Sequence, residues 1–497
     1  MPNTRREFLK PDGRGAVGAT VFPSLGKNAE PDLQALENAG VKKPRRVMLL
    51  ARNQLNFSKL LILALTGWGM TATGGQPPAN PAPAAYLSAN ITDYGADPSG
   101  QQDCAPAFAR LMAALGTTRH VRVVIPPGKY RLAQQVVFTA DRNDEYYGLH
   151  IEGAGENTTE IIVDNKDGGF AFAGRQITRL SVIVSDLALV AGREGAGTAV
   201  FFDTDNWGVQ NDRQFIARNL AIRGERFDRG HFNTALHVRN AWYALLQNVN
   251  ITQQYGPKMG AKQHSMEYGI LLEDCYSPLI ADCRVENSRY GLVQRAVKIE
   301  PEDGIIRGSY FVGNVEGIVL NIKRDPKNWP EPGFHIDNCH VNYRDCGIRI
   351  NGVRQANISH TLFYCHDHTG TKWFKYETAI IPGGDERHRR DVEPRDVDIA
   401  YGSDIIVDGN IFTEPANPNR VAVRIGPDSG CILISGNQFN MSGTAIKNES
   451  VSPSYSSGNI FVGKPGWSDA LKRYDDKPGK LVVSDFNSKT PQSEHKP

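Results

Sequence analysis

The hexapeptide YGILLE at residues 268–273 is followed by a second copy of the same pattern, YGLVQR, at residues 290–295. In each copy a small residue, Gly269 or Gly291, precedes alternating apolar and outward-facing positions. A period of two is typical of a β-strand, and its recurrence along a chain is typical of a solenoid. The same frame, with an aliphatic residue directly after the small one, occurs in TAVFFD (Ala199), TALHVR (Ala235), YGILLE (Gly269), YGLVQR (Gly291), EGIVLN (Gly317), CGIRIN (Gly347), TAIIPG (Ala379), VAVRIG (Ala422) and TAIKNE (Ala445). The chain is therefore predicted to stack short strands whose aliphatic side chains point to one side.

A second frame lies between these strands, where one Asn, Asp or Gly interrupts an apolar alternation. These residue types tolerate the left-handed backbone conformation that a tight corner needs. The frame occurs at Asp186, Asn219, Asn248, Asp282, Asn338, Gly409 and Gly436. Each coil is therefore predicted to hold three short strands and one short corner.

Long insertions flank the strands of the first frame on both sides, and the corner opposite stays short. They lie before the strand at residues 223–233, 252–268 and 364–377, and after it at residues 297–303, 322–333 and 383–402. This distribution predicts a groove with two walls, whose floor is the outer face of these strands.

The overall charge argues against a nucleic-acid or anionic-membrane partner. Lys and Arg number 56 and Asp and Glu number 54, so the formal net charge of the 497-residue chain is only +2. The seven cysteines show no CxxC spacing, and their odd number argues against a complete disulfide framework. Most of them are predicted to be buried thiols.

The first 85 residues read as an export signal and linker. TRREFLK at residues 4–10 is similar to a twin-arginine signal, and Arg45 and Arg46 precede FSKLLILALTGWGM, an apolar run too short for a stable membrane span. A true start near Met48 is the alternative. We expect a secreted or periplasmic protein, with export signal and linker at 1–85, a β-helix domain at 86–463 and a polar tail at 464–497, where LVVSDF could add a strand.

A helix is predicted at the start of the solenoid, directly after Asp103. In CAPAFARLMAAL one face carries Phe108, Leu111, Met112 and Leu115, Asp103 can cap the amino end, and Gly116 can end the helix. Because a stack of coils exposes apolar side chains and unpaired backbone at its first coil, such a helix is suited to cover that end.

Two motifs in this region resemble the entry motif of the pectate-lyase-like right-handed parallel β-helix superfamily, which includes rhamnogalacturonase, epimerase and tailspike-related proteins. They are DYGADPSGQQD at residues 93–103, followed by Ala107 and Ala113, and IPPGKYRL at residues 125–132. Through the coil pattern the resemblance covers about residues 91–461. It is specific for the fold and weak for the activity, since the polygalacturonase motifs NTD, DD, GHG and RIK are not found in order.

The resemblance implies an all-β fold: a right-handed single-stranded parallel β-helix with three short sheets and an N-terminal capping helix. In that superfamily the groove binds carbohydrate and the Asn-marked corner forms an internal ladder. Members include polysaccharide lyases, glycoside hydrolases, epimerases and phage tailspike depolymerases. The resemblance therefore implies an exported enzyme that cleaves a polysaccharide. A non-catalytic carbohydrate-binding scaffold is the alternative, and a homo-oligomer such as a trimer stays open.

The outward positions of four successive strands carry alternating charges. They are Asp203, Arg239, Glu273 and Arg295, and parallel neighbours stack about 4.8 Å apart. Such a ladder can simply fix strand register. It can also form a site, because carboxylates two rungs apart lie about 9–10 Å from each other, near the separation of the acid and base of an inverting glycosidase. In the hydrolase hypothesis, slightly favoured, Asp203 and Glu273 are acid and base.

Loop carboxylates could shorten the distance between the acid and the base. Asp205 and Glu267 are placed for this role by their position beside the strands. Asp205 is therefore also a candidate for binding substrate.

A polysaccharide lyase would use the basic residues instead. It needs cations to stabilise charge at a uronate carboxylate and a base for the neighbouring proton. His237 or His264 could be the base, and the candidate cations are Arg239, Arg295, Lys298, Lys323 and Arg349. Glu300, Glu302 and Asp303, beside Lys298, could hold calcium, although an acidic surface loop explains them equally. CHDH at residues 365–368 lacks an identified fourth ligand, so no metal site is predicted there.

Aromatic side chains in the predicted loops could lie against sugar rings. Tyr255, Trp329 and Trp373 are assigned to substrate binding on this basis, and Trp207 and Tyr376 are further candidates. Each could equally pack within its own loop.

Overall fold

The computed structural model describes residues 87–116, 120–140, 147–175, 180–204, 213–226, 229–252, 266–322, 331–365, 393–413, 419–462 and 471–485. The chain divides into two units, Met1–Ala79 and Asn80–Pro497, and all described residues belong to the second. In this described part no helix is both long and apolar enough to cross a membrane.

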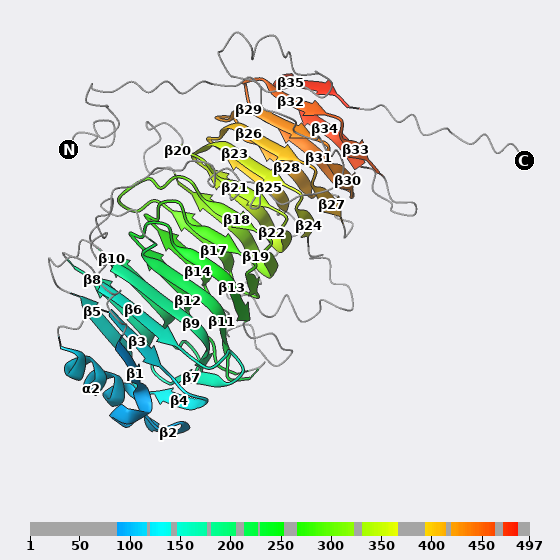
Figure 1. Ribbon diagram of the computed structural model, residues 1–497. Coiled ribbons are helices and arrows are strands. Elements are labelled where there is room, and N and C mark those ends of the chain that lie inside the picture. The colour runs from blue at the N-terminus through cyan, green and yellow to red at the C-terminus, as the bar shows by residue number, and fades with distance from the viewer. Residues whose placement is uncertain are drawn as a thin grey trace, which may run out of the picture. The chain divides into compact units, whose positions relative to one another are not determined.

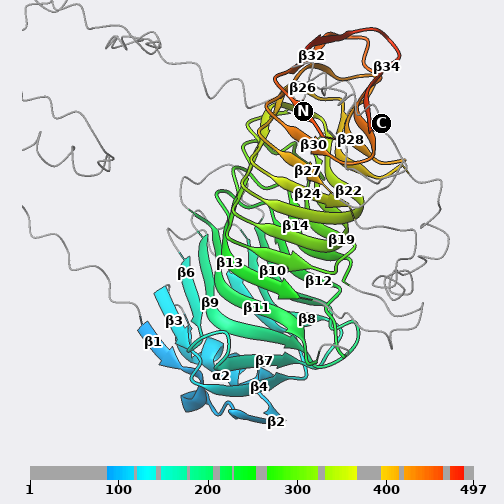
Figure 2. The ribbon, with the colours of Figure 1, turned by 90° about the vertical axis from the view of Figure 1, so that its right-hand side faces the viewer.

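The second unit is a solenoid of parallel strands, stacked in chain order from the N-terminal to the C-terminal end (Figures 1 and 2). Its strands pair into three ladders, here called A, B and C, and the candidate site lies on ladder A. Ladder A consists of β5 (Val136–Ala140), β8 (Gly168–Gly174), β10 (Thr198–Thr204), β12 (Thr234–Arg239), β14 (Tyr268–Glu273), β17 (Tyr290–Arg295), β19 (Tyr310–Asn321), β22 (His340–Asn351), β25 (Arg395–Ala400), β28 (Val421–Ile425), β31 (Gly443–Asn448) and β34 (Leu471–Asp476).

Ladders B and C form the other two sides. Ladder B consists of β1 (Leu87–Asn90), β3 (His120–Val124), β6 (Tyr147–Glu152), β9 (Leu180–Ala191), β11 (Phe215–Gly224), β13 (Leu245–Thr252), β15 (Leu279–Ala281), β18 (Ile305–Arg307), β21 (His335–Asp337), β23 (Val353–Ser359), β26 (Ser403–Asp408), β29 (Gly430–Ser435), β32 (Ser454–Ser457) and β35 (Leu481–Ser484). Ladder C consists of β2 (Ser99–Asp103), β4 (Gly128–Leu132), β7 (Thr159–Val163), the later parts of β9, β11 and β13, β16 (Arg284–Glu286), the early parts of β19 and β22, β24 (Leu362–Cys365), β27 (Ile411–Thr413), β30 (Gln438–Asn440) and β33 (Ile460–Phe461). The short β20 (Glu331–Pro332) pairs with β23.

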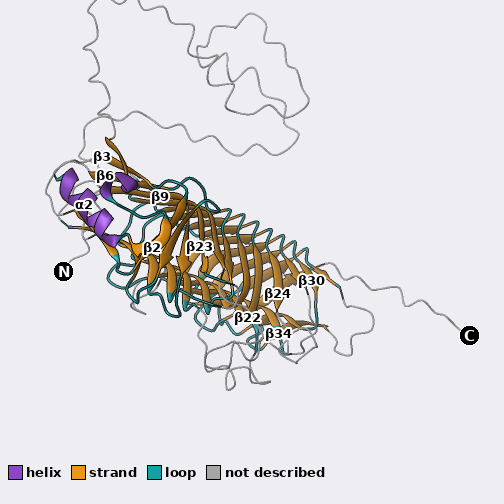
Figure 3. Cartoon of the chain, turned by 90° about the horizontal axis from the view of Figure 1, so that it is seen from below, coloured by secondary structure: helices purple, strands orange, loops and turns teal. Residues whose placement is uncertain are grey.

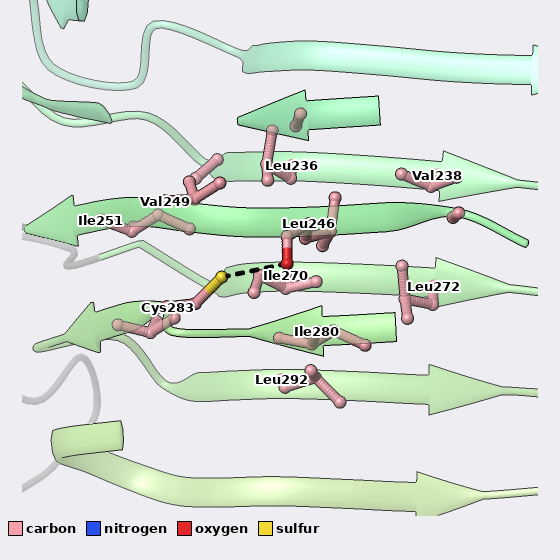
Figure 4. Packing of buried hydrophobic residues seen from close by; sticks show 14 of the residues in the cluster. Leu236, Val238, Leu246, Val249, Ile251, Ile270, Leu272, Ile280, Cys283 and Leu292 are labelled. Atoms are coloured by element: carbon pink, nitrogen blue, oxygen red, sulfur yellow. Dashed lines mark hydrogen bonds between the residues drawn. The ribbon is translucent and has the colours of Figure 1, made fainter. Parts of the chain in front are cut away.

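The three ladders enclose one apolar core, in which like positions stack rung upon rung. Leu236, Ile270 and Leu292 are in register on ladder A and fully buried (Figure 4). All seven cysteines are free thiols, and only Cys431 is exposed. The sequence-based prediction of mostly buried thiols is therefore confirmed.

The glycines at the second position of β14 and β17 have a steric cause. A Cβ atom on Gly269 would lie 2.7 Å from the carbonyl oxygen of Gly291, and one on Gly291 would lie 2.5 Å from that of Gly317. A real Cβ atom does not approach a backbone oxygen so closely. These two rungs can therefore stack at their observed spacing only with glycine at both positions, whereas some other ladder A strands carry Ala, or Asp396 in the case of β25, at the equivalent place.

The predicted corners are confirmed, because all seven residues of the second frame have a positive φ. Their φ angles are 60° at Asp186, 52° at Asn219, 51° at Asn248, 56° at Asp282, 52° at Asn338, 64° at Gly409 and 62° at Gly436. The side chains that follow the last two form an internal polar ladder: the Asn437 side-chain oxygen accepts the Asn410 N–H at 2.9 Å, and that of Asn459 accepts the Asn437 N–H at 2.9 Å. The internal ladder expected from the resemblance thus uses the residue after the corner.

The predicted capping helix is present at the N-terminal end of the solenoid (Figure 3). It follows η3 (Ile91–Tyr94), and α2 spans Ala105–Leu115 and ends at Gly116. Phe108, which is buried, packs edge-on against Phe138 of β5. Asp103 was predicted as the N-cap, but the N-cap is Cys104, one residue later. The Asp103 carboxylate instead accepts hydrogen bonds from the N–H groups of Ala105 and Ala133.

One predicted rung is replaced by another segment. TAIIPG, around Ala379, lies outside the described residues, and the rung between β22 and β28 is β25. The long loop predicted at residues 383–402 is wrong for Arg395–Ala400, which form this strand. The cause is that β25 has Asp396 where the frame requires Ala or Gly. At the other end, the strand predicted within LVVSDF is present as β35.

Candidate functional site

The four charged positions predicted from the sequence are in register on the outer face of ladder A. Asp203 pairs with Arg239, Arg239 with Glu273, and Glu273 with Arg295, on β10, β12, β14 and β17. Asp203 and Arg295, at the two ends of this row, are more than 90 positions apart in the chain but lie on one ladder. Figure 1 shows β10, β12, β14 and β17 following one another along the solenoid.

Asp203 is nearly buried and carries three side-chain hydrogen bonds. Its carboxylate accepts from Arg239 at 2.8 Å, from Arg175 at 3.0 Å and from Asn240 at 2.9 Å. Burial acts to raise the pKa of Asp203, but the bonds from Arg239, Asn240 and Arg175 outweigh it, so the pKa lies below its ordinary value. Asp203 is therefore ionised at neutral pH.

Glu273 lies between a histidine and an arginine. Its carboxylate is 2.8 Å from the Nε2 atom of His237 and accepts from Nε of Arg295 at 2.9 Å. The hydrogen bond from His237, followed by that from Arg295, outweighs the effect of burial and lowers the pKa of Glu273 to about 2.

These pKa shifts disfavour the acid–base assignment of the hydrolase hypothesis. A glycosidase needs one carboxyl group whose pKa is raised, so that it still carries a proton near neutral pH. The pKa values of both carboxyl groups are lowered, that of Asp203 chiefly by Arg239 and that of Glu273 chiefly by His237 and then by Arg295. Neither carboxyl group is suited to protonate a leaving oxygen.

The solvent-facing part of this row is made of guanidinium groups. The side chains of Asp203 and Glu273 are only 5% and 7% exposed, whereas those of Arg175, Arg239 and Arg295 are 42%, 38% and 36% exposed. The acidic groups thus lie beneath the basic ones, and a molecule that approaches this face meets cations first.

His237 adds an imidazole side chain beside this row. It lies on β12, one alternation before Arg239, with its ring 4.9 Å from that of Phe201. If Nε2–H donates to Glu273, the neutral tautomer leaves Nδ1 as a proton acceptor. The bond to Glu273 then holds the orientation of the His237 ring.

An apolar strip continues from His237 along the same face. Leu271, Val293 and Val319 follow it in register, form a cluster separate from the main core, and pack against Tyr268 and Tyr290. The two tyrosine rings are stacked with centroids 5.3 Å apart. Apolar and aromatic surface of this kind is suited to the faces of sugar rings.

The other predicted residues fall into two groups. Arg349 lies on this face, in contact with Glu316 and Asp398, and Lys298 is exposed in the loop after β17, where its N–H donates to Asp274. Outside the described residues lie Asp205, Trp207, Tyr255, His264, Lys323, Trp329, Trp373 and Tyr376. The loops that contain them, predicted as groove walls, are likewise not described over most of their length.

The remaining candidates add no contact to the row. Glu267 pairs with Arg289 rather than with Asp203 or Glu273. Within the described ranges, no group of three or more His, Cys, Asp or Glu side chains is arranged to hold a metal ion. The acidic loop of Glu300, Glu302 and Asp303, considered for calcium, lies within these ranges.

Several residues at this face were not found from the sequence, among them Arg395 and Arg424 on β25 and β28. Arg175 lies after β8, a strand outside the nine repeats of the first frame, and Asn240 lies just past the end of β12. Asp398 is on β25, the rung that the frame missed. Of Arg175, Asn240 and Asp398, only Asp398 could have been found from the sequence, because polar and apolar residues alternate in DVDIA as in the neighbouring ladder A strands.

The lowered pKa of Glu273 predicts a change of stability with pH. Its folded-state pKa of about 2 lies below the ordinary value of 4.5, so the ionised carboxylate stabilises the fold above pH 4.5, by about 3 kcal/mol. This contribution is lost as the pH falls from 4.5 toward 2. In denaturant titrations, Glu273→Gln should be less stable than wild type at neutral pH, and the difference should shrink over that interval. A difference that stays constant down to pH 2 would contradict the assignment.

The three ladders, the corners and the capping helix define a parallel β-helix of the pectate-lyase-like class. A family model described as "Rhamnogalacturonase A/epimerase, pectate lyase-like" matches residues 88–341, about half of the chain. The chain belongs to this family of carbohydrate-active β-helix proteins, as the resemblance in the sequence indicated.

Solved structures support the fold. The A-module of the mannuronan C-5 epimerase AlgE4 of Azotobacter vinelandii has a TM-score of 0.53 at 15% identity, with 80% of this chain and 99% of that chain covered. The DFA-IIIase of Arthrobacter chlorophenolicus A6, without its lid and in complex with GF2, has a TM-score of 0.51 at 12% identity, with 77% and 100% covered. No curated protein sequence matches the chain.

Proposed function

We propose that the protein acts on an acidic, uronate-containing polysaccharide that lies along the outer face of ladder A, and that it removes the proton beside the uronate carboxylate. The observation that carries this proposal is the layering of charge: guanidinium groups more than a third exposed cover carboxylates that are nearly buried. A neutral glycan would gain little from such a face, whereas a uronate carboxylate can form charge-assisted hydrogen bonds with it.

In the proposed reaction His237 is the base, and two arginines stabilise the negative charge that develops. His237, oriented by Glu273, takes the proton at C5 of the sugar, and the electron pair moves toward the carboxylate. Arg239 and Arg295 stabilise the negative charge that grows on the carboxylate oxygens. The electron pair then either expels the oxygen at C4, which takes a proton from water as the chain is cleaved by β-elimination, or accepts a proton from water on the opposite face, which epimerises the sugar.

This proposal ranks the lyase-type reaction above the hydrolysis that the sequence slightly favoured. Hydrolysis by Asp203 and Glu273 would need a proton on one of them, and both pKa values are lowered. The matched family model is named after a hydrolase and an epimerase with a pectate-lyase-like fold, and the AlgE4 module is named as an epimerase of mannuronan. These names support a reaction in which a proton beside a carboxylate is removed on a β-helix of this kind. Export of the protein is part of the proposal.

Product analysis on a polysaccharide panel tests the proposal. Alginate, polygalacturonate and rhamnogalacturonan serve as acidic polymers, and dextran and inulin as neutral ones. We expect either the ultraviolet absorbance of an unsaturated uronate or exchange of the C5 hydrogen for deuterium in heavy water, with an acidic polymer only. New reducing ends without either signal would indicate hydrolysis and overturn the proposed reaction, and activity on a neutral polymer would overturn the proposed substrate.

A further inference from the structure

A second group of arginines lies on the same face of ladder A, on rungs farther toward the C-terminal end. The carboxylate of Asp398 accepts from Arg349 at 2.9 Å, from Arg395 at 2.8 Å and from Arg424 at 2.9 Å. These four residues are called the Asp398 cluster below. They come from β22, β25 and β28.

The Asp398 cluster repeats the layering of charge seen around Asp203 and Glu273. The side chain of Asp398 is 4% exposed, whereas those of Arg349, Arg395 and Arg424 are 37%, 26% and 18% exposed. Burial acts to raise the pKa of Asp398, but the three arginines outweigh it and hold the pKa below its ordinary value. One buried negative charge thus faces three guanidinium groups.

Carboxylates at the edges hold the arginines toward this centre. Arg349 also donates to Glu316, and Arg424 to Glu449 through two of its nitrogens. Because the guanidinium groups are fixed by these bonds, they lose little side-chain entropy when an anion binds. Arg395 likewise donates to Glu393 at 3.2 Å, so each of the three arginines is bonded to a second carboxylate besides Asp398.

The Asp398 cluster is aligned with the proposed site. His237, Leu271, Val293, Val319 and Arg349 follow one another in register, and Asp398 and Arg424 continue the same row. Four strand spacings separate His237 from Arg349, which is about 19 Å. The apolar strip of Leu271, Val293 and Val319 fills the interval, with the stacked tyrosines beside it.

We propose that the Asp398 cluster is a distal binding site for the same acidic polysaccharide, so that one chain bridges from His237 across the apolar strip to Arg349, Arg395 and Arg424. This inference rests on the proposed function and adds to it a preference for long chains. A short oligouronate bound at His237 cannot reach the cluster, whereas a polymer occupies both ends of the row.

Binding measurements with alginate and polygalacturonate, each as polymer and as trisaccharide, test this proposal. In titration calorimetry, Arg349→Gln and Arg424→Gln should each weaken polymer binding about tenfold, as expected for loss of a hydrogen bond to a charged group. Trisaccharide binding should not change. Each variant leaves Asp398 with two arginines, so folding should be preserved, as a thermal melt can verify.

Arg131→Gln is the matched control, because Arg131 is 41% exposed and paired with Asp164, but lies on β4 of ladder C. It should bind both polymers like wild type. Equal weakening of polymer and trisaccharide binding, equal weakening by the control, or no weakening in either variant would each overturn the distal site. If the wild-type protein binds neither polymer, the acidic substrate of the proposed function is overturned as well, which separates the two failures.

Discussion

Replacing His237 with glutamine is expected to lower kcat on the acidic polysaccharide by about 10²–10⁴-fold, the range contributed by general acid–base catalysis. Glutamine keeps a donor toward Glu273 but has no nitrogen that can accept a proton at neutral pH. Since Arg239 and Arg295 are unchanged, KM should change much less than kcat. Initial rates on the acidic polymer that gives product with wild type measure both constants.

His150→Gln is the matched control for this experiment. His150 also lies on an outer strand face and beside a glutamate, with Nε2 2.9 Å from Oγ of Ser185 and Nδ1 3.7 Å from Glu152, but it belongs to β6 of ladder B. Its replacement should leave kcat unchanged. A loss of less than tenfold in His237→Gln, or an equal loss in His150→Gln, would show that His237 is not the base.

Replacing Asp396 with alanine is expected to destabilise the protein by about 3–5 kcal/mol, the cost of leaving one partner of a buried ion pair alone. Asp396 and Arg420 are both fully buried, with Nε of Arg420 2.9 Å from the carboxylate, and the Tyr343 hydroxyl donates to it at 2.7 Å. Without Asp396 the guanidinium group keeps its bond to the Thr413 carbonyl but loses the buried carboxylate, and its charge stays in the core. Denaturant titrations followed by circular dichroism measure the loss.

A double variant separates the ion pair from simple packing. Asp396→Leu with Arg420→Met replaces both charges by apolar groups, and such replacements are often neutral or stabilising. The double variant should therefore be more stable than Asp396→Ala. If Asp396→Ala costs less than about 1 kcal/mol, or if the double variant is the less stable of the two, the buried charge is not the cause.

The sequence repeat explains why so much of the fold could be predicted from the sequence. Gly269 and Gly291 are small because a Cβ atom would meet the carbonyl oxygen of the next rung, and Asn219 turns the chain because it tolerates a positive φ. Both requirements are local and recur along the solenoid, so the sequence pattern records them. The rung at β25 escaped because Asp396 occupies the small position, and its charge is tolerated only through Arg420, a partner 24 residues later.

The sequence by itself determined the solenoid, the three strands per coil, the corners and the row of Asp203, Arg239, Glu273 and Arg295, because alternation and small residues act through nearest neighbours. Only the tertiary structure decided what that row can do. Arg175 and Asn240 cover Asp203, and His237 and Arg295 hold Glu273 ionised. The charge state of a carboxyl group depends on which distant side chains surround it and how deeply they bury it. Neither property follows a repeating pattern in the sequence, so neither can be predicted from the repeat.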